Sequence, residues 1–173
     1  DIGYYPRAEF HYRQRDSGVS QHILIYCTDG SGWLKIKGKE FRIEPGQFFI
    51  IPANMPHRYG SDEKHPWSIY WLHFKGVLSG QLTDKLTLKE TTFCRSITYS
   101  EERINLFNTI YNILEMGYSE DQLGYISMCL WHFLSTFCYA DAFSLLSKKE
   151  NTDMIDLSIQ FMRDNLHKKL SLK

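Results

Sequence analysis

The chain has no net charge and no long uninterrupted hydrophobic run. Its 20 Lys and Arg residues balance 20 Asp and Glu residues over 173 positions, so no overall positive charge favours contact with nucleic acid. The most apolar segment, 123–139, contains Ser127, His132, Ser135 and Thr136, which favours a buried helix over a membrane span. Because the sequence also lacks a signal-peptide pattern, we expect a cytoplasmic protein without a membrane segment.

Cysteine is scarce, and the motifs of nucleophilic catalysis are missing. The four cysteines, Cys27, Cys94, Cys129 and Cys138, form no CxxC pair and stand among apolar residues, which is typical of reduced, buried thiols. The sequence has no GxSxG motif, and none of its Ser or Cys residues stands in a motif that supplies a general base. We therefore expect that the protein is not an enzyme.

Aromatic residues, in contrast, are abundant, and residues 1–75 are patterned as β-structure. An aromatic content of 15% favours a well-filled core or an aromatic-lined pocket. Short runs of strand-forming residues lie at 9–15, 22–28, 33–37, 41–43 and 67–74, with turn residues between them. Several short strands at this spacing predict a sandwich or a barrel.

The stretch 44–57 combines two turns and a buried strand. Pro45-Gly46 is a strong turn signal, and the apolar run 48–51 is typical of a strand that is covered on both faces. Pro52 ends this strand because it cannot donate to a ladder. Asn54 tolerates the left-handed backbone of a tight turn, and His57 is predicted to begin the next strand.

The pattern changes to helical spacing after about residue 98. Ser100 is a candidate cap for a helix with apolar residues up to Leu114, and Ser119-x-x-Gln122 is a capping box for a second helix. Apolar residues cover much of that second helix, so it needs two packing partners. We expect the β-structure as one partner and the same helix of a second subunit as the other. The alternative is that this helix packs only inside its own subunit. The candidate dimer residues are Leu123, Ile126, Leu130, Phe133, Leu134 and Phe137.

The spacing Gly46-x5-Pro52-x-Asn54-x2-His57 resembles the second motif of cupins, with Asn54 where a glycine is usual. Together with Arg58-Tyr59-Gly60 it more narrowly resembles the effector-binding domain of AraC-family transcription regulators, from about Tyr4 to the C-terminus. The resemblance implies a mainly β fold with C-terminal helices (α+β), namely a cupin-like antiparallel β-barrel (jelly roll) followed by a helical pair.

The resemblance also implies a domain order. We expect the effector-binding barrel at 1–98, a helical dimerisation segment at 99–143, a linker at 144–152 and the first helix of a truncated DNA-binding domain at 153–173. The chain begins without Met and stops within a helical pattern, so we expect a piece of a longer protein. The expected partners are a small-molecule effector, a second copy of the chain, and DNA only through the largely absent C-terminal domain.

Polar residues on one predicted strand are the first candidates for an effector site. His11, Arg13 and Arg15 share one face of the run 9–15, and cationic groups do not face an apolar core without a partner. The alternative is that this face is solvated and that Phe10 and Tyr12 face the core.

The resemblance places further residues at an effector pocket. An arginine, a tyrosine and a tryptophan line the pocket of sugar-binding relatives, and they match Arg15, Tyr59 and Trp71. Plain core packing is the alternative for Trp71. A histidine of those relatives falls on Ile69, and Tyr5 lies where an N-terminal arm can cover the effector. With Arg13 and His11 added, we expect a carbohydrate or a sugar acid.

Metal-dependent chemistry requires more ligands than the sequence offers. A metal cupin needs a His-x-His and a Glu in a first motif, whereas the segment 19–25 contains only His22. We therefore expect no metal and no cofactor. His57 at the pocket mouth stays a candidate ligand-binding residue, although a structural role as a donor to a backbone carbonyl is favoured. Two alternatives stay open: a cupin enzyme, such as a sugar isomerase or dioxygenase, and a ligand-independent dimerisation scaffold.

Overall fold

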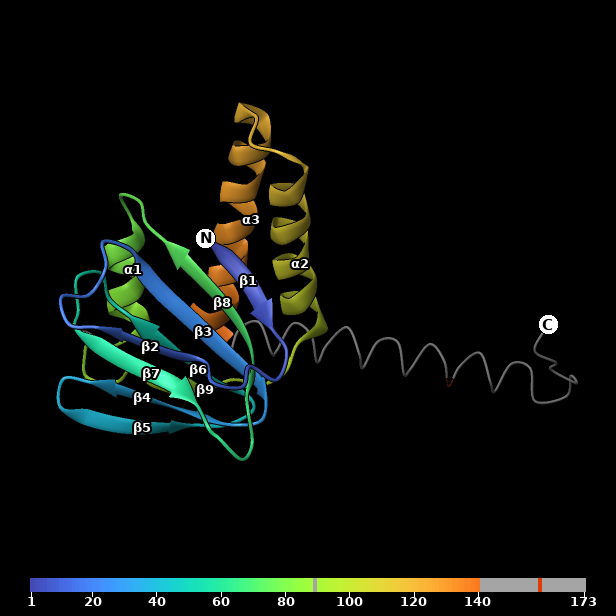
Figure 1. The fold of residues 1–173 in the computed structure, drawn as a ribbon. Coiled ribbons are helices and arrows are strands. Elements are labelled where there is room, and N and C mark those ends of the chain that lie inside the picture. The colour runs from blue at the N-terminus through green and yellow to red at the C-terminus, as the bar shows by residue number, and fades with distance from the viewer. Residues whose placement is uncertain (89, 141–158, 160–173) are drawn as a thin grey trace, which may run out of the picture. The chain divides into compact units, whose positions relative to one another are not determined.

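The computed structural model describes residues 1–88, 90–140 and 159, and residues Asp1–Cys138 form one compact unit (Figure 1). The strands are β1 (Ile2–Tyr5), β2 (Tyr12–Arg15), β3 (His22–Asp29), β4 (Gly32–Ile36), β5 (Lys39–Ile43), β6 (Gln47–Ile51), β7 (His57–Ser61), β8 (Ser68–Phe74) and β9 (Cys94–Ser96). The helices are α1 (Ser79–Leu86), α2 (Glu101–Met116) and α3 (Glu120–Cys138). The predicted linker 144–152 and the helix predicted at 153–173 lie outside the described residues, Ile159 apart.

The strands form a five-stranded sheet, ordered β1-β8-β3-β6-β9, and a four-stranded sheet, ordered β2-β7-β4-β5. Every pairing between named strands is antiparallel. The predicted mainly β fold with C-terminal helices is therefore confirmed. Among the described residues, none of the helices has the length and hydropathy needed to cross a membrane.

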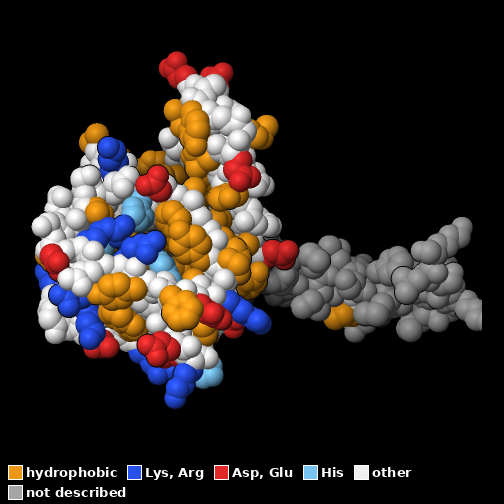
Figure 2. Space-filling view, in the orientation of Figure 1, with side chains coloured by type: hydrophobic (Ala, Val, Ile, Leu, Met, Phe, Trp, Pro, Cys, Tyr) orange, Lys and Arg blue, Asp and Glu red, His pale blue; other side chains and the backbone are white. Residues whose placement is uncertain are grey.

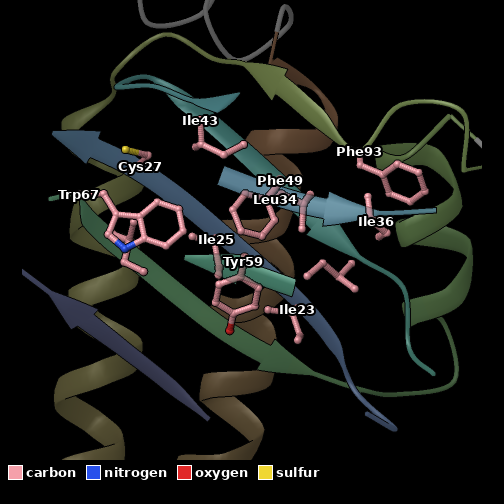
Figure 3. Packing of buried hydrophobic residues seen from close by; sticks show 12 residues of the cluster. Ile23, Ile25, Cys27, Leu34, Ile36, Ile43, Phe49, Tyr59, Trp67 and Phe93 are labelled. Carbon is pink, nitrogen blue, oxygen red and sulfur yellow. The ribbon is translucent and has the colours of Figure 1, made fainter. Parts of the chain in front are cut away.

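A cluster of buried hydrophobic residues fills the space between the sheets (Figure 3). Trp67 is fully buried there, and its ring stacks near Phe49 with centroids 6.3 Å apart. The sequence of β6 is continuously apolar because both faces of this strand are buried. Phe49 and Ile51 belong to the interior cluster, whereas Phe48 on the other face contacts the Phe137 ring of α3 at 4.9 Å.

The predicted turn and cap residues lie where the sequence placed them. Asn54 has a φ of 61°, β6 ends at Ile51 and β7 begins at His57. The Ser100 hydroxyl accepts a hydrogen bond from the Arg103 amide at 3.3 Å at the start of α2. At the start of α3 the Ser119 amide donates to Gln122 Oε1 at 2.9 Å, and the Gln122 amide donates to Ser119 Oγ at 3.3 Å. This reciprocal pair confirms the capping box.

One local prediction was wrong, and one helix was not predicted. The strand predicted at 9–15 begins only at Tyr12, because Phe10 adopts a left-handed turn conformation with a φ of 58°. Helix α1 was not predicted, since its contact with the barrel uses Thr83 as well as Leu86 rather than an apolar stripe. The Thr83 hydroxyl lies 3.0 Å from Nδ1 of His22 on β3, and Leu86 is fully buried.

The candidate dimer residues of α3 separate into two groups. Ile126, Phe133, Leu134 and Phe137 are buried inside the subunit, with exposed fractions of 7% or less. Leu123 is 43% exposed and Leu130 is half-buried. For the buried group, packing within the subunit is therefore the correct interpretation, and only the exposed part of α3 is free for another molecule.

Arg103 joins α2 to α3 and to the chain before α2, and its guanidinium lies over the Tyr26 ring of β3 at 5.8 Å. Its side chain is 1% exposed, and Nε donates to Thr136 Oγ1 of α3 at 2.9 Å. Nη1 donates to the Thr98 carbonyl at 2.8 Å and Nη2 to the Thr136 carbonyl at 3.3 Å. The guanidinium also lies over the Phe137 ring at 4.9 Å. A buried charge of this kind is tolerated because acceptors surround it.

Arg103→Met should lower the free energy of unfolding by about 3 kcal/mol, because the buried hydroxyl and carbonyl of Thr136 lose their donor. Urea denaturation measures this change. Arg58→Met is the matched control, since Arg58 makes an exposed contact to Asp16 at 3.6 Å and its replacement should cost less than about 1 kcal/mol. Equal losses for the two variants would contradict the assigned role of Arg103.

Candidate functional site

A cavity of about 220 Å³ opens between the edges of the two sheets. Strands β1 and β2 are the edge strands there, and β7, β3 and β8 supply the remaining walls. Basic and histidine side chains gather beside hydrophobic ones on this face of the molecule (Figure 2). The lining residues are Asp1, Tyr5, His11, Arg13, Arg15, Ile25, Tyr59, Trp71 and His73.

The cavity brings together most of the residues predicted for the site, namely Tyr5, His11, Arg13, Arg15, Tyr59 and Trp71. Phe10 and Tyr12 are 94% and 47% exposed, so the alternative that they face the core is wrong. Ile69 lies deeper, fully buried in the interior cluster. His57 does not line the cavity but contacts Arg15, with Nη1 and Nε2 3.4 Å apart.

Trp71 forms an aromatic wall with Tyr5, the ring centroids being 5.4 Å apart. Gly3 lies directly opposite Trp71 in the β1–β8 register, and a Cβ at Gly3 would be 2.7 Å from Cζ2 of the indole. The glycine therefore lets β1 lie on the indole face. The buried Nε1 of Trp71 finds no hydrogen-bond acceptor among the residues that the structure describes.

A hydrogen bond from Trp67 determines which ring nitrogen of His11 is protonated. The Trp67 indole N–H donates to His11 Nδ1 at 3.2 Å, and an indole nitrogen can only donate. Burial, assisted by Arg13, lowers the pKa of His11 from 6.5 to about 4. The ring is therefore neutral near pH 7, Nδ1 is its acceptor, and Nε2 carries a hydrogen that can be donated.

Arg13 and Arg15 give the cavity a positive charge. Nη1 of Arg13 donates to the Tyr12 carbonyl at 2.8 Å. Within the described ranges neither guanidinium forms an ion pair with a carboxylate, and Asp1 is the acidic residue of the lining. Guanidinium groups of this kind bind carboxylate or phosphate groups in a bidentate geometry.

His73 belongs to the cavity but was not predicted. Its Nδ1 lies 3.4 Å from Gln21 Oε1, and burial, followed by the charge of Arg15, lowers its pKa to about 4. The available signal was the period of two along β8, which places Trp71 and His73 on one face. The other unpredicted lining residues are Ile25 and Asp1.

His22 has a structural environment rather than that of a metal ligand. Its Nδ1 accepts a hydrogen bond from the Ala53 amide at 3.2 Å and lies 3.0 Å from the Thr83 hydroxyl. Over the part of the chain that is described, His, Cys, Asp and Glu side chains form no group of three or more that could hold a metal ion.

Known proteins with similar sequences are regulators. The family model of the AraC-like ligand binding domain matches residues 2–126. The MmsAB operon regulatory protein of Pseudomonas aeruginosa is 26% identical over 99% of this chain and 55% of its own length. The raffinose operon transcriptional regulatory protein RafR of Pediococcus pentosaceus is 23% identical over 83% of this chain and 53% of its own. The chain thus spans about half the length of these curated relatives.

Two further matches are a shorter sequence match and a solved structure. The arabinose operon regulatory protein of Escherichia coli is 32% identical over 35% of this chain and 21% of its own length. Among solved structures, an apo ToxT variant of Vibrio cholerae superposes with a TM-score of 0.50 at 18% identity, over 87% of this chain and 56% of the other. That structural likeness concerns the fold alone.

The two cavity histidines predict a loss of stability in acid. Their pKa in the folded chain is about 4, against an ordinary value of 6.5, so the unfolded chain binds protons that the folded chain does not. The free energy of unfolding should therefore fall as the pH is lowered from about 6.5 to about 4. Urea denaturation at several pH values should show a smaller fall in His11→Gln/His73→Gln than in the unaltered protein. The exposed His65→Gln is the control, and a double variant with an unchanged pH dependence would contradict the prediction.

Proposed function

The chain belongs to the family of AraC-like ligand-binding domains, and on this premise we propose that it senses an anionic carbohydrate, such as a sugar acid, for a transcription regulator. The observation that carries the proposal is the pair Arg13 and Arg15 beside an aromatic wall, without a carboxylate partner for either among the described residues. The regulator would act in the cytoplasm and contact DNA through another domain.

The cavity offers mainly hydrogen-bond donors. These are the guanidinium groups, the Nε2 hydrogen of His11 and the hydroxyls of Tyr5 and Tyr59. A donor-rich cavity with a positive charge selects a ligand that is rich in acceptors and negatively charged, because a buried donor without an acceptor costs about 1–3 kcal/mol. A sugar carboxylate with its hydroxyl groups has this composition.

The aromatic wall and the cavity size indicate a ligand with a single ring. Trp71 and Tyr5 offer apolar faces that can stack on the C–H face of a sugar. A volume of about 220 Å³ lies below the roughly 300–1,000 Å³ of sites for drug-sized ligands. Two relatives regulate a raffinose operon and an arabinose operon, which supports a carbohydrate as the class of effector.

A catalytic role receives little support from the same residues. The relatives are regulators, and the cavity holds nitrogen donors rather than a metal-ligand set or an activated nucleophile. We therefore propose that the protein is not an enzyme. Two alternatives to a sensor are a cupin enzyme that requires a bound transition metal and a scaffold that binds no ligand. The following experiment distinguishes both from a sensor.

The effector proposal is tested by calorimetry and thermal shift with D-glucuronate and D-galacturonate against D-glucose and D-galactose. We expect the acids to bind and to raise the melting temperature. Arg15→Met should weaken acid binding about tenfold or more, because a charge-assisted hydrogen bond is lost. Arg58→Met is the control, since Arg58 lies on the neighbouring strand β7 with an exposed side chain. Equal binding of neutral sugars, a response to divalent metals only, or no response to any of these compounds would contradict the proposal.

We also propose that the chain forms a homodimer through the exposed side of α3. Met128 is 74% and Trp131 45% exposed there, and Val77 beside this helix is 99% exposed. An apolar groove of about 350 Å³ lies between the loop 75–78 and α3, lined in part by Leu130 and Trp131. Contiguous exposed apolar surface of this kind is typical of an interface.

Met128→Glu should shift the dimer towards monomer, because it buries a charge in the apolar contact. Light scattering after size exclusion, over a range of concentrations, measures the mass. Met116→Glu at the end of α2 introduces the same charge at a residue that is 78% exposed and should leave the mass unchanged. A monomeric unaltered protein at all concentrations would contradict the dimer.

A further inference from the structure

His57 lies behind the ligand cavity and is almost fully buried, with 4% of its surface exposed. It stands directly opposite Arg15 in the β2–β7 register, and its ring stacks on that of Tyr59 with an interplanar angle of 5°. His57 is absent from the cavity lining. A ligand in the cavity would therefore meet Arg15 and Tyr59 before it met His57.

The two ring nitrogens of His57 have different partners. Nδ1 lies 2.7 Å from the Met55 carbonyl, and a carbonyl can only accept, so Nδ1 carries the hydrogen. Burial lowers the pKa of His57, which keeps the ring neutral near pH 7. Nε2 therefore presents a lone pair, and this lone pair faces Nη1 of Arg15 at 3.4 Å.

We propose that His57 is a positioning residue that holds the Arg15 guanidinium towards the cavity and does not itself contact the effector. The inference rests on the proposed binding of an anion at Arg15. Arg15 belongs to the edge strand β2, where a long cationic side chain would otherwise turn towards water. Tyr59, which lies on strand β7 like His57, lines the cavity with Arg15, and burial raises the pKa of the Tyr59 hydroxyl, a shift that Arg15 opposes.

The chemistry of the acceptor explains why an imidazole occupies this position. A carboxylate at position 57 would also orient Arg15, but the resulting ion pair would cancel the positive charge that attracts an anion. A neutral imidazole nitrogen accepts a hydrogen bond and leaves the charge of the guanidinium intact. His57 thus preorganises Arg15 without lowering its attraction for a carboxylate.

Nitrogen-15 NMR of the ligand-free protein tests the geometry directly. We expect His57 at pH 7 to be the neutral tautomer with hydrogen on Nδ1, and its Nε2 resonance to shift in Arg15→Met. The Arg15 Nε–H group should become more mobile in His57→Phe, which keeps an aromatic ring but has no acceptor. An Nε2–H tautomer, a charged ring, or unchanged Arg15 mobility would overturn the proposal, whatever the effector is.

Calorimetry with D-glucuronate tests the consequence for binding. His57→Phe should weaken binding about tenfold, and His57→Gln, which restores an acceptor, should recover much of the loss. His57→Glu should remove the preference for D-glucuronate over D-glucose, because it neutralises Arg15. The exposed His65→Phe is the matched control. Equal affinity of His57→Phe and His57→Gln for the acid would show a merely structural histidine and overturn the proposal.

The two proposals fail in different ways. If the unaltered protein binds none of the acids, the proposed effector class is wrong, while the tautomer of His57 and the mobility of Arg15 still decide the positioning role. If the acids bind but His57→Phe only lowers the melting temperature, the effector class stands and the positioning role is wrong.

Discussion

Both faces of the five-stranded sheet must be covered, and the rest of the structure follows from this constraint. One face closes over the interior cluster with the four-stranded sheet. The other carries aromatic residues, such as Tyr70, which meets Phe107 of α2 with ring centroids 4.8 Å apart. The helical hairpin thus covers this second face of the sheet. The buried Arg103 holds the hairpin together through hydrogen bonds to α3 and to the chain before α2.

The ligand cavity exists because the two sheets do not close against each other at β1 and β2. The cationic side chains of Arg13 and Arg15 line the gap at that edge, while Trp71 and Tyr5 form one apolar wall. The histidines there are neutral through burial, so the permanent charge comes from Arg13 and Arg15. Affinity for an anion would then depend on how well these side chains are oriented, since their charge does not change near pH 7.

Strand β8 joins the cavity to the helical hairpin. Its period of two sends Trp71 and His73 into the cavity and Tyr70 towards α2. Strand β1 does the same at the edge, with Tyr5 at the cavity and Tyr4 against Tyr70 at 4.5 Å. An effector could shift the helices only if its affinity differed between two conformations of the chain. Strands β8 and β1 contact both the cavity and the helical hairpin or its neighbours, so they would connect the two.

Local chemistry determined what the sequence alone could predict. The limits of β6, the left-handed turn at Asn54 and the capping box at Ser119 depend on a few neighbouring residues. The tertiary structure alone decided which side of α3 is buried, that Phe10 turns outward, that His73 joins the cavity and that His57 faces Arg15. Each of these depends on strand register and on packing between segments far apart in the chain, which hydrophobic periodicity does not encode.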